Sequence, residues 1–556
     1  MTEPTCNRFT CSQQPVQPSK ALRAHWLEQV RTMFRQGNFE SCIGRCQSIL
    51  GLAGKDVDIL HLLGVAEVKS GSVDEGLTAL AEAQRLAPDD AALCIDYAMA
   101  HGIAGHLDEA ITILTDACVR HPSSPDLASH LAEVLSDADR LDDVHRVLKH
   151  AIAQTPAESE LYCLLAANLA SDLKTEEALV LLNRALCLDP NDSRILTNLG
   201  VLYQALGDID TATTYYLRAT VDAVPNKLAQ INLALTYLIR SNLAEGFAML
   251  ENRFGESHIR IPPSGLPRWR GQPLLNRHLL VTAEQGYGDM IQYARFLHRL
   301  APLGGKITVE CQPGLERLLA TIPCVEATVT LGNRFPSVDY TVPLLSLPYV
   351  LGCPPNLLND TIPYLPVSEE PGYQLPDRGK LKIGVVWAGR PASGDVYVRR
   401  SLNRRTCPLR ELAPIMTIPG IDFFSLQMGD AVGQIAETGF PLTNLAPHIT
   451  DFYDTALFMR QMDLVISIDT AAAHLAGAIG VPLWVLLSPG QTDYRWGTRS
   501  PTTPWYPRAQ LFRAARSGWT SAIAPLATSL AELVVQQKQP SDIAPAGSPA
   551  SKPKIQ

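Results

Sequence analysis

Small and apolar residues recur with a fixed period through the first half of the chain, between residues 21 and 257. Gly64, Ala98 and Ala132 stand 34 positions apart, and so do Pro88 and Pro122. Small side chains at fixed helical positions let two helices approach closely, and proline cannot continue a helix. The pattern therefore predicts an α-solenoid of helix pairs over residues 21–257. The two columns continue at Ala166, Gly200 and Ala234, and at Pro156 and Pro190.

This stretch resembles the tetratricopeptide repeat, whose period is 34 residues. The first unit, about residues 24–57, fits the consensus poorly and is expected to cap the stack. Asp208-Ile-Asp210 has the form of a metal-binding Asp-x-Asp, but it falls in a turn between two predicted helices, which favours helix capping. The residues that fit the consensus best are Leu199, Gly200, Tyr203, Ala212, Tyr216 and Ala219.

The second half of the chain alternates short apolar runs with helical segments, which is typical of doubly wound α/β domains. Two such domains are predicted, over residues 258–370 and 380–537, joined by a polar linker. The fold class is thus α plus α/β, a solenoid followed by a pair of Rossmann-like domains. The expected buried strands are His278–Thr282, Lys306–Glu310 and Ala327–Leu331, then Leu381–Trp387, Ile421–Leu426, Leu464–Ile468 and Pro482–Leu487.

Composition narrows the functional classes. The formal net charge is −9, so a general nucleic-acid binder, which needs a basic surface, is not expected. No apolar run is long enough to span a membrane and the polar N-terminus lacks a signal core, so the protein is expected to be cytoplasmic. The 12 cysteines are scattered, which favours buried thiols over zinc sites or disulfides. The polar ends, residues 1–20 and 538–556, are expected to be disordered.

One strand–turn–helix segment has the strongest chemical signal. Asp469 and Thr470 follow a predicted buried strand, Ala471 begins a predicted helix, and His474 lies one turn further along it. A helix that begins at the carboxyl edge of a parallel sheet presents free N–H groups and a positive dipole end, which suit a phosphate. The alternative is that Asp469 and Thr470 are ordinary helix caps.

The first α/β domain carries a glycine loop after its first strand. Gly286 and Gly288 precede Asp289, which would lie at the start of a helix. Two glycines indicate close backbone approach, but the third glycine of a dinucleotide fingerprint is absent. A nicotinamide or flavin site stays open as an alternative, because Glu310 ends the next strand where such a fingerprint has its acidic residue. Asp289 is either a helix cap or a general base.

The order of these motifs resembles the heptosyltransferase-related glycosyltransferase family 9, in the bacterial branch with N-terminal tetratricopeptide repeats. That family has the GT-B arrangement of two Rossmann-like domains facing each other. The motifs that carry the resemblance are Trp269, Glu284–Asp289, Ala388-Gly389, Arg405-Thr406-x-Pro408-Leu409, Ser425-Leu426-Gln427, Asp469-Thr470-x-x-x-His474 and Arg495-Trp496.

The resemblance implies an inverting transfer of sugar from a nucleoside-diphosphate sugar, without metal or other cofactor. It makes Asp289 the catalytic base and Glu284, Gln285, Gly286 and Gly288 the acceptor-side loop. Arg405 would contact the phosphates, with Arg400 as a rival. The implied donor-binding residues are Ala388, Gly389, Arg405, Gln427, Asp469, Thr470, Ala471 and His474.

Three functions remain open at this point. In the first, an active glycosyltransferase modifies a protein or glycan that the repeats recruit. In the second, the repeats bind proteins and the transferase half is an inactive scaffold, although the presence of both Asp289 and His474 favours activity. In the third, the chain is a heptosyltransferase acting on a lipid-linked glycan. Lipopolysaccharide-core transferases lack a solenoid, so the acceptor and heptose as donor sugar both stay open. Self-association through the repeats is a further alternative.

Overall fold

The structure is a computed structural model that describes residues 18–221, 226–254, 265–354, 356–358, 362–368, 372–389, 400, 403–490 and 493–538. Nearly all of the two predicted disordered ends, residues 1–20 and 538–556, lies outside these ranges, as does part of the linker around residue 370. The chain divides into two compact units between Pro190 and Asn191. Each unit is described by itself.

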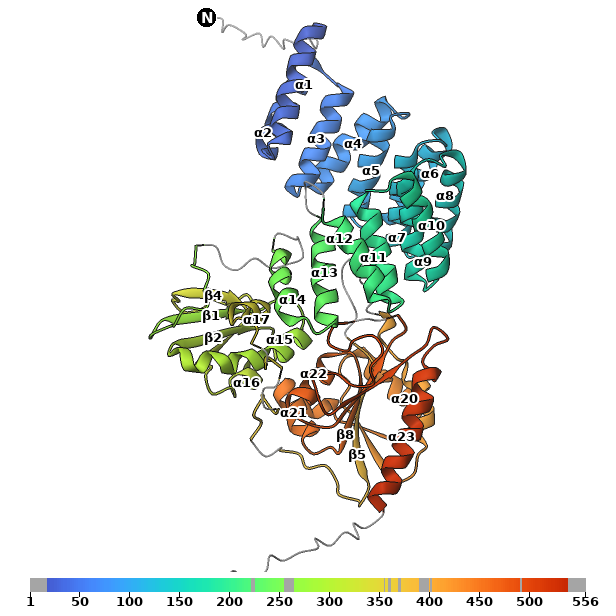
Figure 1. Cartoon of the computed structure of the whole chain (residues 1–556). Helices are drawn as coiled ribbons and strands as arrows, with labels where there is room; N and C mark the ends of the chain where they lie inside the picture. Colours follow the sequence, from blue (N-terminus) through green and yellow to red (C-terminus); the bar gives the residue numbers. More distant parts are fainter. Residues whose placement is uncertain are drawn as a thin grey trace, which may run out of the picture. The chain divides into compact units, whose positions relative to one another are not determined.

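The first unit is a stack of antiparallel helix pairs, coloured blue to blue-green in Figure 1. Side chains of Asp56, Asp90 and Ser124 cap the helices that follow them by accepting a hydrogen bond from a backbone N–H. The helices are α1 (Lys20–Arg35), α2 (Phe39–Ala53), α3 (Val57–Ser70), α4 (Val73–Leu86), α5 (Ala91–Ile103), α6 (Leu107–Arg120), α7 (Pro125–Asp137), α8 (Leu141–Gln154), α9 (Ser159–Ser171) and α10 (Thr175–Leu188).

The columns of small residues mark the places where paired helices touch. A Cβ atom on Gly64 of α3 would lie 2.8 Å from the carbonyl oxygen of Gly76 in α4, and a Cβ on Gly76 would lie 2.7 Å from the carbonyl oxygen of Gly64. Ala98 and Ala110 are fully buried at the equivalent positions of α5 and α6. The predicted solenoid is therefore confirmed, and its physical reason is the close backbone approach that these residues allow.

The second unit begins with two more helix pairs, α11 (Ser193–Ala205) with α12 (Ile209–Ala219), and α13 (Lys227–Ile239) with α14 (Leu243–Leu250). Asp208 caps α12 by accepting a hydrogen bond of 3.1 Å from the backbone N–H of Thr211, as the capping interpretation predicted. The last pair, α13 and α14, packs against the α/β part. Phe247 and Leu250 share one hydrophobic core with the first sheet, and buried Arg253 pairs with buried Glu284 at 2.8 Å.

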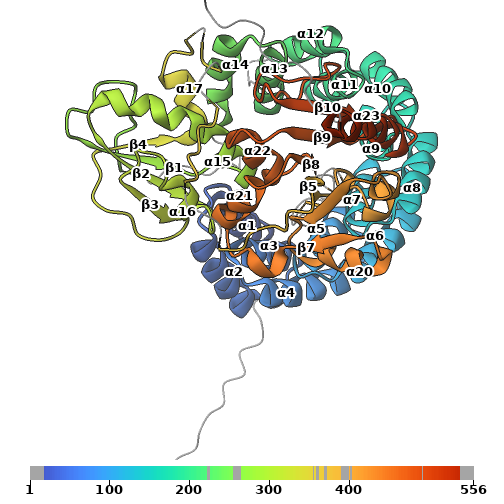
Figure 2. The same cartoon turned by 90° about the horizontal axis from the view of Figure 1, so that it is seen from below.

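The first α/β lobe, residues 265–368, is built on a four-stranded parallel sheet with strand order β3-β2-β1-β4, and Figure 2 labels all four strands. Four of the five residues of β1 are buried, which explains its continuous apolar run. The strands are β1 (His278–Thr282), β2 (Lys306–Cys311), β3 (Ala327–Thr330) and β4 (Tyr340–Pro343). Its helices are α15 (Tyr287–Tyr293), the 3-10 helix η2 (Ala294–Leu303), α16 (Glu316–Leu319) and α17 (Leu347–Val350).

The second α/β lobe, residues 372–538, has a six-stranded parallel sheet with strand order β10-β9-β8-β5-β6-β7. Figure 2 shows α22 and α23 beside β9, and β7 and α20 at the other end of the sheet. The strands are β5 (Leu381–Val386), β6 (Ile421–Ser425), β7 (Leu442–Asn444), β8 (Leu464–Ile468), β9 (Leu483–Leu487) and β10 (Ala509–Arg513). The main helices are α19 (Ala413–Met416), α20 (Gln434–Thr438), α21 (Phe452–Met459), α22 (Ala471–Ala478) and α23 (Thr520–Lys538).

Both faces of the second sheet are covered. Leu483 and Val485 of β9 belong to the core that contains α22, whereas Leu486 belongs to the core that contains α23. The chain runs from β5 outward to β7 on one side, then returns to add β8, β9 and β10 on the other. The order of strands thus reverses between β5 and β8. In doubly wound sheets, ligands bind at the carboxyl ends of the strands next to such a point.

Candidate functional site

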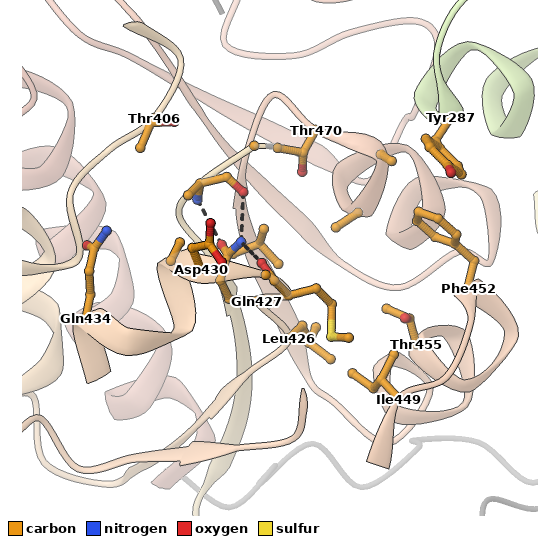
Figure 3. A pocket seen from close by; sticks show the side chains of 18 of the residues that line it. Tyr287, Thr406, Leu426, Gln427, Asp430, Gln434, Ile449, Phe452, Thr455 and Thr470 are labelled. Atoms are coloured by element: carbon orange, nitrogen blue, oxygen red, sulfur yellow. Dashed lines mark hydrogen bonds between the residues drawn. The ribbon is translucent and has the colours of Figure 1, made fainter. Parts of the chain in front are cut away.

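A cavity of about 1120 Å³ lies at the carboxyl ends of β5, β6 and β8, next to the reversal of strand order (Figure 3). The second lobe supplies most of its wall. The first lobe contributes Tyr287, Pro313 and Gly314. Apolar side chains, among them Leu426, Ile449 and Phe452, form one side of it. The two lobes therefore share a cavity in which most contacts to a ligand would come from the second lobe.

Gln427 fixes the loop that follows β5. Its side-chain oxygen accepts hydrogen bonds from the backbone N–H groups of Trp387, at 3.1 Å, and Ala388, at 2.9 Å. Its side-chain nitrogen donates to the carbonyl oxygens of Ala388, at 3.0 Å, and Met428, at 2.9 Å (Figure 3). The amide group is thus fully used within the protein. Gln427 shapes the cavity wall at Ala388 and Gly389 rather than offering its amide to a ligand.

The start of α22 opens into the cavity. Thr470, Ala471 and Ala472 all line it, and Thr470 is the N-cap residue, with extended backbone angles. The Thr470 hydroxyl lies 3.1 Å from the hydroxyl of Ser467 and makes no capping hydrogen bond. The first N–H groups of a helix have no partner inside the helix. The start of α22, where the sequence predicts a phosphate site, therefore lies at the wall of the cavity.

Asp469 and His474 lie behind this wall. The carboxylate of Asp469 accepts a hydrogen bond of 2.8 Å from the indole N–H of Trp496 and pairs with Arg405 at 3.2 Å. The imidazole of His474 stacks on Trp496, and its Nδ1 lies 2.9 Å from the hydroxyl of Tyr506. Burial lowers the pKa of His474 to about 3, helped by Arg495, so the ring is neutral at physiological pH.

Arg405 is the basic residue that pairs with Asp469. Its Nε is buried and has no hydrogen-bond partner within the ranges that the structure describes, which leave out residues 390–399, 401 and 402. Asp469 holds the other end of the guanidinium. Arg404 Nε donates to the backbone oxygen of Arg400, the alternative phosphate ligand. Arg399 and Arg390, the other arginines of this loop, lie outside the described residues.

Asp289 meets the second lobe through Arg495. One carboxylate oxygen of Asp289 accepts a hydrogen bond of 3.1 Å from the backbone N–H of Gly286, so the residue does cap α15, and the other oxygen pairs with Arg495. Burial raises the pKa of Asp289, and Arg495 only partly opposes that rise. Gly288 lies against His474, where a Cβ atom would be 2.7 Å from the ring carbon Cδ2. The glycine loop was expected to approach another group closely, and Gly288 makes this approach to the second lobe.

Two groups of side-chain contacts between the lobes bear on the site, and we name them the inner and outer contacts. In the inner contact Arg495 also binds Gln292, the hydroxyls of Tyr293 and Tyr494 lie 2.9 Å apart, and Arg295 donates to the backbone oxygen of Trp505 at 2.9 Å. The outer contact borders the cavity. There Tyr287 stacks on Phe452, the Phe452 N–H donates to the Gly314 oxygen at 3.1 Å, and Arg317 pairs with Asp451 and Asp454 at 2.9 and 3.1 Å.

The predicted site residues fall into three sets. Ala388, Gly389, Gln427, Thr470 and Ala471 line the cavity. A second set, Asp289, Arg405, Asp469 and His474, forms a polar group behind it that spans both lobes. The remaining loop residues have structural contacts, with Gly286 as the N-cap of α15 and Gly288 against His474.

Two acidic side chains near the glycine loop are bound by Arg253, which precedes the first lobe, and by a backbone N–H of that lobe. Glu284 accepts hydrogen bonds from Arg253, at 2.8 and 3.1 Å, while the carbonyl oxygen of Gln285 accepts one from Gln312 at 2.9 Å. Glu310, on which the dinucleotide alternative rests, accepts a hydrogen bond of 3.3 Å from the backbone N–H of Ala283. Its carboxylate therefore supports the end of β1.

Sequence reasoning did not select Tyr287, Phe452 or Gln292, and it did not pair Arg495 with Asp289. A signal for both positions was present in the sequence for the two aromatic residues, because Tyr287 stands between the two loop glycines and Phe452 follows the helix cap Asp451. Nothing in the spacing indicated that the two rings stack. Within the described residues, no group of three His, Cys, Asp or Glu side chains is arranged to hold a metal ion. The helices of the described chain include none that is long and apolar enough to cross a membrane.

Comparison with known proteins identifies the repeats. Residues 181–214 match the model of the tetratricopeptide repeat family. Protein FlbA of Caulobacter vibrioides is 27% identical over 376 residues, which are 60% of this chain and 59% of that relative. The chain thus covers less than two thirds of the relative's length.

Solved structures also resemble parts of the chain, at low sequence identity. They include pilF of Pseudomonas aeruginosa (15% identity, 35% of this chain and 89% of that one, TM-score 0.31). A tetratricopeptide repeat protein from Parabacteroides merdae has 11% identity over 41% of this chain and 90% of that one, with a TM-score of 0.34. The chain therefore combines a tetratricopeptide-type helical solenoid with a parallel-sheet α/β region.

Proposed function

We propose that the protein is a glycosyltransferase of the GT-B type that moves a sugar from a nucleoside-diphosphate sugar to an acceptor recruited by the repeats. The observation that carries the proposal is the cavity at the reversal of strand order, with the start of α22 in its wall and the first lobe opposite. That position favours a phosphorylated ligand at the helix N-terminus. Two Rossmann-like lobes that share one such cavity are what the GT-B arrangement requires.

The donor diphosphate would be stabilised by dipoles and one guanidinium. The N–H groups at the start of α22 lie at the cavity wall, and the guanidinium of Arg405, paired with Asp469 behind that wall, would add a positive charge. His474 would add no positive charge, because its ring is neutral at physiological pH. This arrangement supports a metal-independent departure of the diphosphate.

The chemical step would be a single displacement. Asp289 takes the proton of the acceptor hydroxyl as the acceptor oxygen forms its bond to the anomeric carbon. The bond between that carbon and the diphosphate oxygen breaks, and its electron pair leaves with the nucleoside diphosphate. One displacement inverts the anomeric centre. The raised pKa of Asp289 fits a base that works near neutral pH.

The repeats support recruitment of the acceptor, since helical solenoids offer extended binding surfaces. The acceptor in this proposal is a protein or a glycan. The alternative is a protein-binding scaffold with an inactive transferase half. One observation favours that alternative: both carboxylate oxygens of Asp289 already have partners, Gly286 and Arg495.

A ligand screen on the full chain tests the donor site. We expect one of UDP, GDP, ADP, CDP or dTDP, or a sugar ester of it, to raise the melting temperature, because a ligand that binds only the folded state stabilises it. Ala471→Asp puts a negative charge at the start of α22 and should weaken that nucleotide at least about tenfold in calorimetric titration. An acidic residue at a helix start favours the helix itself, so the fold should persist.

The matched control is Ala413→Asp, the same change at the first residue of α19, which does not line the cavity. This variant should bind the nucleotide like the wild type. The proposal fails if no nucleotide or nucleotide sugar binds, or if Ala471→Asp binds as tightly as the wild type.

A further inference from the structure

Arg495 makes several contacts where the lobes meet. Its guanidinium reaches three acceptors, which are the carboxylates of Asp289 and Asp493 and the side-chain oxygen of Gln292. It also lies 4.4 Å from the ring centroid of Tyr494. Only 11% of the side chain is exposed. Such a guanidinium is fixed in place and has little freedom to turn toward a ligand in the cavity.

We propose that Arg495 is a positioning residue for Asp289. Its guanidinium comes from the second lobe and holds the carboxylate of the base charged and correctly oriented. The base is therefore complete only while the lobes are in contact. This inference rests on the proposed function, because it gives Asp289 the role of base. The family resemblance included Arg495 in a motif without a role. The role follows from the contacts in this structure.

Among the charged groups around Asp289, Arg495 is the one that favours the ionised form of this carboxylate. Asp493 and Asp469 face it with like charge, and both raise its pKa, as does burial. Tyr293 and Tyr494 present a pair of hydroxyls whose pKa values are raised by burial, so both are neutral. His474 is neutral as well. Arg495 is the cation that opposes these effects, so Asp289 would be protonated more readily without it.

The same contacts orient the carboxylate. The backbone N–H of Gly286 binds Oδ2 and Arg495 binds Oδ1, one from each lobe. Each carboxylate oxygen has two lone pairs, so each keeps one for the hydrogen of an acceptor hydroxyl. The proton taken from that hydroxyl would remain on Asp289 until product leaves. Partial occupation of the carboxylate is therefore compatible with base catalysis.

The pairing also links the base to the state of the lobes. Asp289 belongs to α15 of the first lobe, and Arg495 follows β9 of the second, 206 residues later. Any separation of the lobes that breaks the inner contact removes the cation from Asp289. The desolvated carboxylate would then bind a proton or be hydrated. Such a base would act only in the assembled site.

The test is a double-substitution cycle on the full chain, with melting temperature measured between pH 4 and 8. In the wild type, Asp289→Asn should lower the melting temperature near pH 7, because it leaves Arg495 without one of its partners. In the Arg495→Gln background the same change should raise it, because it removes an unpaired buried carboxylate. That gain should shrink as the pH falls and Asp289 becomes protonated.

Arg317→Gln is the matched control background. Arg317 also joins the lobes by ion pairs, but with Asp451 and Asp454 and not with Asp289. There, Asp289→Asn should act as in the wild type. If Arg495→Gln does not fold, Arg495→Lys replaces it. A point charge without the planar fork should then move the effect of Asp289→Asn partway toward the glutamine result.

The proposal is overturned if Asp289→Asn has the same effect at each pH with and without Arg495. This cycle needs no donor, so it decides the pairing even if the nucleotide screen is negative and the proposed function fails. With the nucleotide sugar that the screen identifies, the acid limb of the pH–rate profile should move up by about one to three pH units in Arg495→Gln. An unmoved limb would contradict the positioning role, since a loss of packing alone does not shift it.

Discussion

The inner and outer contacts join the same two lobes in different ways. Arg295, in the inner contact, is 1% exposed and lies 4.7 Å from the ring centroid of Tyr364 and 5.3 Å from that of Tyr506. In the outer contact, the Arg317 side chain is 50% exposed. Ion pairs in solvent contribute little to stability, whereas buried hydrogen bonds are costly to break. The inner contact is therefore the strong connection and the outer contact the weak one.

The cavity lies on the weak side. Tyr287, Gly314, Asp451 and Phe452 belong both to its wall and to the outer contact. A ligand could enter by parting these residues while the inner contact, with Asp289 and Arg495, stays in place. The difference in burial thus indicates which side of the lobe pair opens. Three substitutions test whether the two contacts differ in this way.

The largest effect is expected from Arg295→Ala. This change leaves the Trp505 carbonyl without its donor and creates a cavity between the lobes, so we expect a loss of about 3 kcal/mol or more. Calorimetry of the full chain would show it as a lower melting temperature of the α/β transition. Arg299→Ala, one turn later in the same helix η2, changes an exposed contact to the Asn356 carbonyl and should have much less effect. Equal losses would remove the distinction between the contacts.

An intermediate effect is expected from His474→Gln, and it depends on pH. The folded-state pKa of His474 is lowered to about 3, so the unfolded chain binds a proton between roughly pH 6.5 and pH 3 that the folded chain does not. As the pH falls through this range, the free energy of unfolding of the wild type should therefore decrease by about 1.4 kcal/mol per pH unit on account of His474. The variant lacks this contribution, so its stability relative to the wild type should improve as the pH falls. Parallel pH curves from denaturant unfolding would contradict it.

The smallest effect on stability is expected from Arg317→Gln. Its ion pairs are half-exposed, so the loss should stay within about 1 kcal/mol. The change should instead loosen the outer contact locally. Hydrogen exchange at the backbone N–H of Phe452, which donates to Gly314, should become faster, while exchange near Tyr293 should not. Slow exchange at Phe452 in the variant would show that the outer contact does not depend on Arg317.

Local patterns predicted most elements of the fold. The strands β1 and β8 have the predicted limits, and each of the other five predicted strands differs at one end by one residue. Three strands, β4, β7 and β10, were not predicted. β7 has only three residues, β4 ends at Pro343, and β10 carries Gln510 and Arg513 among its apolar residues. Short or mixed runs of this kind resemble loops until a neighbouring strand supplies their hydrogen bonds.

The candidate site was predictable only in part, for a related reason. The N-terminus of α22 follows from a buried strand, a cap and a helix, all within one segment of the chain. By contrast, the engagement of the Gln427 amide with Ala388, 39 residues away, required two strands to pair in a parallel sheet. The neutral state of His474 depends on burial under Trp496 and Tyr506, which no spacing revealed.

The repeat period, the apolar runs and the helix caps were enough to predict the solenoid, the α/β region and the start of α22, because these signals act over a few neighbouring residues. The pairing of Arg495 with Asp289, 206 residues apart, and the stacking of Tyr287 on Phe452 became visible only in the folded chain. The identity of a charged or aromatic residue does not indicate which distant residue it will contact. Their partners are set by how the two sheets pack, and burial then fixes which of the paired groups hold their protons.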